Sequence, residues 1–260
     1  MSALDSVVSR VIDSLTGLEG VVAVTIGGSR SLGTNLPTSD WDIGLYYRTA
    51  FSVDQLRGLG HAGKVVAPGD WGRIMNGGAW WTVEGRKIDV LLRDLDIVDH
   101  WTAEAESGRF EVDNVHGYLA GLPTYSLSAE LALGKVLVGD LARPGFPNAL
   151  KESAPNYWSY VAAFSLLYAD RHAASSEVSN CFGAIAKAAV AEANSRLAGQ
   201  GEWVLNEKGI LGRAGLQQVD AVLSEAPSPG DLSLAVESTR RILNLFRPPP
   251  GFPPDAIVRR

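Results

Sequence analysis

The residue pattern of the chain changes near residue 126, and this change limits the folds that it can adopt. Before it, short β-branched runs such as VVAVTI at 21–26 and WDIGLYY at 41–47 follow turn residues, as buried strands do. After it, segments rich in alanine and leucine repeat their apolar residues at helical spacing. We therefore expect an α+β protein, with an α/β domain built on a mixed sheet at residues 1–122 and an all-helical domain at residues 123–260.

The first half is expected to contain helices and a hairpin beside the two strands. Glu84 and Gly85 join two apolar runs within residues 80–94, and glycine can supply the positive φ of a tight turn, so this segment predicts a hairpin. Apolar spacing and terminal capping residues predict helices at residues 3–18, 52–60 and 97–108.

The second half is expected to consist of helices separated by loops that are rich in proline and glycine. The RPPPGFPPDA segment near the C-terminus cannot continue a helix and predicts an extended, proline-rich tail. The expected helices cover residues 128–139, 159–174, 181–197, 215–226 and 231–246.

Composition excludes several classes of protein. The formal net charge of −6 disfavours duplex nucleic acid as the main partner, because proteins that bind it present a net basic face. Cys181 is the single cysteine, so no internal disulfide can form and a reducing compartment fits. The N-terminal residues resemble no signal peptide, and no apolar run approaches the roughly 20 residues of a membrane helix. These features predict a soluble, cytoplasmic protein with no membrane partner.

Two aspartates stand one residue apart at the start of the second strand. Side chains of a strand point to alternate faces, so Asp40 and Asp42 are expected to share a face, with Trp41 directed into the core. One interpretation is that they are ordinary solvent-exposed turn acids. The other is that they hold a cation, because packing gains nothing from two like charges that face the same way.

Neighbouring residues favour the second interpretation. Gly27, Gly28 and Ser29 follow the first strand, where glycines let backbone N–H groups approach an anion, and Arg30 offers a cationic partner for phosphate. Mg²⁺ binds a few carboxylates and completes its shell with phosphate oxygens and water. The combination predicts chemistry on a nucleoside triphosphate.

A third acid is then expected on a neighbouring strand. Asp89 is the only charged residue between Ile88 and the apolar run Val90–Leu92, where an unpaired acid is costly. The alternative for Asp89 is an ion pair with Arg86 or Lys87 at the strand entrance.

These motifs resemble a known family. Gly28-Ser29 followed by Asp40-x-Asp42 and a later strand aspartate is similar to the signature of the nucleotidyltransferase superfamily related to DNA polymerase β. The stretch from Gly28 to Thr34, followed by SDWD, resembles its small bacterial branch, which includes aminoglycoside and lincosamide nucleotidyltransferases. The resemblance covers roughly residues 20–95, and an α/β domain followed by a helical one matches the layout of the family.

The resemblance implies roles for the acids. Asp40 and Asp42 would ligate one or two Mg²⁺ ions. Asp89 would be a third ligand or the base that takes a proton from the acceptor hydroxyl, with Glu84 a weaker competitor for the role of base.

The same resemblance implies a triphosphate site. Gly28 and Ser29 would hold the triphosphate of ATP or another nucleoside triphosphate. Lys208, in the segment WVLNEKG, would face the phosphates, although it could equally be an ordinary solvated loop lysine. Arg30 and Lys208 would offset the charge that grows on the departing pyrophosphate.

The implied activity is transfer of a nucleoside monophosphate, AMP in the first instance, to a hydroxyl of a small molecule such as an aminoglycoside. Such an activity would confer antibiotic resistance. The alternatives are transfer to tRNA or protein, as in some toxins, and a non-catalytic nucleotide-binding protein. The glycine- and tryptophan-rich segment 68–81 is a candidate acceptor loop, and the sequence does not determine the oligomeric state.

Overall fold

The computed structural model forms two compact units, which are described separately. The first comprises Met1–Ala105 and Pro123–Gly145, and the second Glu106–Leu122 and Phe146–Arg260. Residues 123–145, which the sequence assigns to the second domain, thus group with the first unit, and residues 106–122 with the second. The structure describes residues 4–33, 36, 38–49, 51–225 and 229–245.

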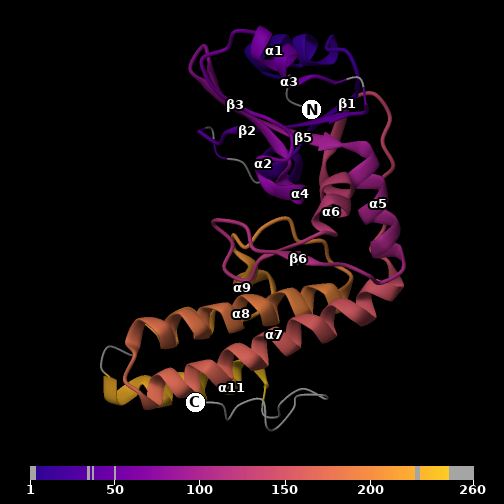
Figure 1. Ribbon diagram of the computed structural model, residues 1–260. Coiled ribbons are helices and arrows are strands. Elements are labelled where there is room, and N and C mark those ends of the chain that lie inside the picture. The colour runs from indigo at the N-terminus through magenta and orange to yellow at the C-terminus, as the bar shows by residue number, and fades with distance from the viewer. Residues whose placement is uncertain (1–3, 34–35, 37, 50, 226–228, 246–260) are drawn as a thin grey trace. The chain divides into compact units, whose positions relative to one another are not determined.

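A six-stranded mixed sheet forms the centre of the first unit, as expected (Figure 1). Its strand order is β3-β4-β5-β2-β1-β8; β2 and β5 are parallel, and every other neighbouring pair is antiparallel. The strands are β1 (Val21–Ile26), β2 (Trp41–Tyr47), β3 (Gly63–Val66), β4 (Gly77–Val83), β5 (Arg86–Asp94) and β8 (Lys135–Val138).

Helices lie on both faces of this sheet (Figure 1). Helices α1 and α3 pack on one face, which we call the apolar face, against core residues such as Ile43, Leu45, Ile88 and Val90. The opposite face carries Asp42 and Asp89, and we call it the acidic face. The helices of the unit are α1 (Ser6–Thr16), α2 (Gly28–Leu32), α3 (Val53–Gly58), α4 (Gly72–Met75), α5 (Leu95–Glu106) and α6 (Ser126–Leu133).

Local signals in the sequence account for several of these elements. Asp5 accepts hydrogen bonds from the first-turn N–H groups of α1, and Ser52 caps α3 in the same way. Glu84 and Gly85, with φ of 46° and 77°, form the two-residue turn of the β4–β5 hairpin. The predicted strands at 21–26 and 41–47, the hairpin and the three helices are confirmed, with shorter bounds for two of the helices.

The expected helix at residues 128–139 is wrong in its second half. Helix α6 ends at Leu133, the backbone of the next residue, Gly134, is extended, and residues 135–138 form β8 at the edge of the sheet beside β1. The three apolar residues that follow Lys135 fit a helix or a strand equally well by their pattern, and pairing with β1 makes this segment a strand.

A buried ion pair fixes α6 over the end of the acidic face. Arg93 on β5 is 1% exposed and donates to both carboxylate oxygens of Glu130 on α6, at 2.5 and 2.7 Å. It also donates to the backbone carbonyl of Met75, after which the chain leaves α4. The C-terminal half of β5 is therefore covered on this face, while Asp89 lies nearer the N-terminal end of the strand.

The second unit is mainly helical, as expected, and Cys181 is fully buried in it. Its two longest helices, α7 and α8, pack along each other. The proline-rich tail lies outside the described residues, and none of the described helices has the length and apolarity needed to cross a membrane. The helices are α7 (Asn148–Ala174), α8 (Val178–Gln200), α9 (Ile210–Arg213), α10 (Gln218–Glu225) and α11 (Leu232–Leu243), with the short 3₁₀ helix η1 (Pro229–Asp231); a separate small sheet pairs β6 (Val112–Asp113) with β7 (Leu122–Pro123).

Candidate active site

Two of the predicted acids are direct neighbours on the acidic face. In the parallel pair of β2 and β5, Asp42 lies opposite Asp89. Paired residues on adjacent strands point to the same face, so the two carboxylates project together. Asp40, two residues before Asp42, is exposed at the entrance of β2. The structure thus brings together acids that lie more than 40 residues apart in the sequence.

The glycine turn at the start of α2 is fitted to Asp42. Gly28 has a φ of +56°, and a Cβ at this position would lie 1.8 Å from Oδ2 of Asp42. The N–H of Gly27 donates to the backbone carbonyl of Asp42 at 2.8 Å. Only glycine can therefore occupy position 28 while the Asp42 carboxylate keeps its place, and the turn and the acid form one unit of structure.

Burial and two neighbouring acids raise the pKa of Asp89. The pKa of Asp89 rises from 3.8 to about 6, first because burial removes water from the carboxylate, and then because the charges of Asp42 and Asp40 oppose its ionisation. The Lys87 ammonium lowers the same pKa in part. A carboxylate held among like charges is a position where a bound cation would relieve repulsion.

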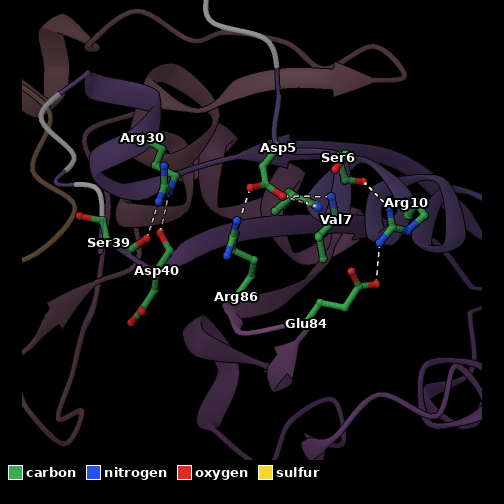
Figure 2. A network of polar contacts seen from close by, with 10 residues as sticks. Asp5, Ser6, Val7, Arg10, Arg30, Ser39, Asp40, Glu84 and Arg86 are labelled. Atoms are coloured by element: carbon green, nitrogen blue, oxygen red, sulfur yellow. Dashed lines mark hydrogen bonds and ion pairs between the residues drawn. The ribbon is translucent and has the colours of Figure 1, made fainter.

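Arg30 holds the loop that carries Asp40. Its Nη2 donates to the carbonyl of Ser39 at 2.5 Å and its Nε to the carbonyl of Asp40 at 3.1 Å (Figure 2). Its guanidinium also lies 3.8 Å from the ring centroid of Trp41, which packs towards the apolar core as expected. The Asp40 carboxylate points away from Arg30 in Figure 2. Arg30 positions this loop, and its contact with phosphate stays a prediction.

The hairpin side chains are paired elsewhere. Arg86 donates to Asp5, the cap of α1, at 2.9 Å, so it does not neutralise Asp89 (Figure 2). Glu84, the weaker candidate for the base, accepts from Arg10 on α1 at 2.5 Å. Both contacts join the hairpin to α1, and they leave Lys87 as the strand-entrance cation that acts on Asp89.

The acids fit a magnesium ion that shares its shell with a substrate. Among the described residues, no group of three or more His, Cys, Asp or Glu side chains is close enough to hold a metal by itself. Mg²⁺ uses one or two carboxylates and takes its remaining ligands from phosphate and water. Two carboxylates beside a glycine turn satisfy that requirement, since the turn would hold the phosphate of the substrate next to them.

A pocket of about 480 Å³ opens beside Asp40, within the size range of small-molecule sites. Its wall mixes carboxylates with cationic groups, so it suits a polar compound. It is lined by Asp5, Arg30, Thr38, Ser39, Asp40, Trp41, Gly85, Arg86 and Lys87.

Lys208 lies in the second unit, in an exposed turn where its backbone N–H donates to the Asn206 side chain at 2.9 Å. The same loop is tied to its own unit by Glu207, whose carboxylate accepts from the N–H groups of Leu119 and Ala120. Contact of Lys208 with a nucleotide therefore stays a prediction.

The acidic face also carries Trp80, from the segment 68–81 that the sequence offered as an acceptor loop, and Lys64, which the sequence did not assign to the site. Trp80 lies opposite Asp89 in the β4–β5 pair, and Lys64 lies opposite Trp80 in the β3–β4 pair. The sequence held a signal for the position of Trp80. The two-residue turn at Glu84 and Gly85 fixes the register of the hairpin, in which Val83 pairs with Arg86. Counting three residues outward along each strand pairs Trp80 with Asp89. No comparable signal located β3.

Comparisons with known proteins assign no family. No protein family model matches the chain, and no curated protein matches it. Among solved structures, it is similar to a nucleotidyltransferase-like protein from Exiguobacterium sibiricum, with a TM-score of 0.45, 8% sequence identity, and coverage of 92% of this chain and 73% of that one. This likeness is too low to support an inference.

Proposed function

We propose that the chain is a Mg²⁺-dependent nucleotidyltransferase that moves AMP from ATP to a hydroxyl of a small molecule and releases pyrophosphate. The observation that carries the proposal is the fit of Gly28 to Asp42, with Asp89 directly opposite on the next strand. A turn that can approach phosphate and a pair of carboxylates that repel each other are the two halves of a site for a metal-bound triphosphate.

Each residue has a part in the proposed reaction. The backbone N–H groups of the turn and the Ser29 hydroxyl bind the phosphates. Asp40 and Asp42 hold the metal, which when bound offsets the negative charge on the phosphate oxygens. Asp89 accepts the proton as the acceptor oxygen bonds to the α-phosphorus and the bond to the pyrophosphate oxygen breaks.

Positioning supplies much of the remaining rate enhancement, because phosphoryl and nucleotidyl transfer require little covalent chemistry from the protein. Arg30 contributes by fixing the backbone carbonyls of Ser39 and Asp40, which sets where the Asp40 carboxylate lies. The formal charge of −6 favours a small-molecule acceptor over tRNA.

The test is transfer of label from α-³²P-ATP to a panel of acceptors, together with pyrophosphate release. Aminoglycosides, a lincosamide and tRNA belong in the panel because the sequence resemblance implies them. We expect Mg²⁺-dependent transfer by the wild-type protein and a loss of at least a hundredfold in Asp42→Asn.

Asp54→Asn is the matched control. Asp54 lies on α3, over the apolar face, and pairs with Arg57, so the same change there should leave transfer unaffected. Equal activity of Asp42→Asn and Asp54→Asn would contradict the proposal.

A further inference from the structure

Four side chains form a row across the acidic face. Asp42 pairs with Asp89, Asp89 with Trp80, and Trp80 with Lys64, on the successive strands β2, β5, β4 and β3. Directly paired residues share a face, so all four side chains project to the same side of the sheet. Strands lie about 4.8 Å apart, so the row spans roughly 14 Å of backbone from the first acid to the lysine.

Trp80 is an exposed ring in this row. It is 48% exposed, whereas Trp81, its neighbour on the apolar face, is 3% exposed and packs in the core. Trp80 packs against Trp71, with 4.6 Å between ring centroids and 35° between ring planes. Core packing explains Trp81, but it leaves half of the Trp80 surface in water directly beside a carboxylate.

A glycine lies beneath the two indoles. Gly78 shares the face of Trp80, and a Cβ there would lie 2.0 Å from the backbone oxygen of Val90 and 2.9 Å from Cζ3 of Trp71. Trp71 therefore lies over a glycine and supports Trp80 from the side. The two rings form an apolar platform, which we call the tryptophan platform, next to Asp89.

One lysine flanks the tryptophan platform on the side away from Asp42, on β3, and a second lies on β5 beside Asp89. Lys64 is exposed, and no hydrogen bond or ion pair of its side chain is found among the described residues. Lys87 lies two residues before Asp89 on the same face, and its charge lowers the pKa of that acid. Across the sheet the surface thus changes from carboxylates to an aromatic ring and then to an ammonium group.

The geometry of transfer gives this platform a role. The glycine turn lies on the β1 side of Asp42, whereas Trp80 lies on the opposite side, beyond Asp89. In an in-line displacement the attacking and leaving oxygens stand on opposite sides of the phosphorus. If pyrophosphate leaves on the side of the turn, the acceptor hydroxyl approaches from the side of Asp89 and Trp80.

We propose that the tryptophan platform binds the acceptor, and that the acceptor is a ring-bearing hydroxyl compound with an anionic group. Its aromatic or pyranose ring stacks on Trp80, its hydroxyl faces Asp89, and its carboxylate or phosphate pairs with Lys64. That this compound is the acceptor of the transfer rests on the proposed function, whereas its chemistry is inferred from the row of side chains alone. A polycation is disfavoured at the β3 end of the row, because Lys64 would repel it there.

The test measures binding rather than turnover, by calorimetry and ligand-observed NMR. The probes are glucose 6-phosphate and 4-hydroxyphenylacetate as ring-bearing anions, glycerol 3-phosphate as an anion without a ring, and kanamycin as a polycation with rings. The variants are Trp80→Leu, Trp80→Phe and Lys64→Gln, each checked by circular dichroism. Tyr160→Leu, at a 39% exposed aromatic residue of α7, is the matched control.

We expect the wild-type protein to bind at least one ring-bearing anion more tightly than either of the other probes. Trp80→Leu should weaken that binding about tenfold, the size expected when a stacking ring is removed. Trp80→Phe should bind within about threefold of wild type because it keeps a ring. Lys64→Gln should weaken the anions alone, and Tyr160→Leu should change nothing.

The inference is overturned if no ring-bearing anion binds, if Trp80→Leu binds it as well as wild type, or if kanamycin binds more tightly. Calorimetry with ATP and Mg²⁺ on the same samples separates the two proposals. Probe binding that depends on Trp80 without any nucleotide binding would refute the proposed function alone. Nucleotide binding that depends on Asp42, with no effect of Trp80→Leu on the probes, would refute the acceptor inference alone.

Discussion

Replacing Asp89 by asparagine should stabilise the metal-free protein at neutral pH. The folded protein raises the pKa of this carboxyl from 3.8 to about 6, through burial and the charges of Asp42 and Asp40. The protonated form is therefore favoured by folding. Its stabilising contribution is full below pH 3.8 and is lost as the pH rises through about 6. Asparagine resembles the protonated acid in shape and never ionises, so it avoids that loss.

The rise in pKa corresponds to about 3 kcal/mol, at about 1.4 kcal/mol for each tenfold change in proton affinity. Asp89 is only partly buried, so solvent screening reduces the expected gain to about 1–1.5 kcal/mol. For a unit of this size that is a rise in Tm of about 3–5 °C at pH 7.5. At pH 4.5, where the native carboxyl is mostly protonated, the two proteins should differ by less than about 0.5 kcal/mol.

Thermal and urea unfolding of both proteins at pH 4.5 and 7.5, in EDTA, measures the effect. Addition of Mg²⁺ at pH 7.5 should stabilise the wild type more than the variant, because the ion relieves the repulsion that asparagine has already removed. Asp54→Asn, at an exposed acid paired with Arg57, should stay within about 0.5 kcal/mol of wild type at both pH values. The reasoning would be refuted by a less stable Asp89→Asn at pH 7.5, or by the same difference at both pH values.

Three further predictions concern the supports of the site. Glu130→Ala should destabilise the protein by about 3 kcal/mol in urea unfolding, because Arg93 would stay buried without its carboxylate; a loss below about 1 kcal/mol would contradict this. Gly28→Ala should cost about 1–2 kcal/mol for the positive φ and displace the Asp42 carboxylate, so calorimetry should show loss of Mg²⁺-dependent ATP binding. Arg30→Gln should slow label transfer about tenfold by loosening the loop before β2, with Tm lowered by only a few degrees; unchanged transfer would show that the loop needs no such support.

Local pattern was sufficient to predict much of the fold. The strands β1 and β2 are continuous runs bounded by turn residues, and the Glu84–Gly85 turn determines the β4–β5 hairpin. Strand β8 was missed because KVLV follows α6 directly and is too short to show a period of its own. Its state is decided by pairing with β1, a segment more than 100 residues earlier.

For the candidate site, local pattern predicts the direction of individual side chains but not which strands become neighbours. The alternation of side chains along β2 correctly predicts that Trp41 faces the apolar core and that Asp42 faces the other side of the sheet. The pairing of Asp42 with Asp89 depends on the parallel register of two strands that are distant in the sequence, which no local signal determines. The structure also shows what glycine at position 28 accommodates, namely the Asp42 carboxylate. For Lys208, the sequence offered a short resemblance and the structure adds only a local turn.

The most direct test of the central claim, that Asp42 and the glycine turn hold a metal-bound triphosphate, is a calorimetric titration with ATP. The wild-type protein and Asp42→Asn would each be titrated with and without Mg²⁺. We predict binding by the wild type that requires Mg²⁺, and at least a tenfold loss in Asp42→Asn with no fall in Tm. Equal binding by the two proteins, or no binding of ATP or any other nucleoside triphosphate in the presence of Mg²⁺, would contradict the account.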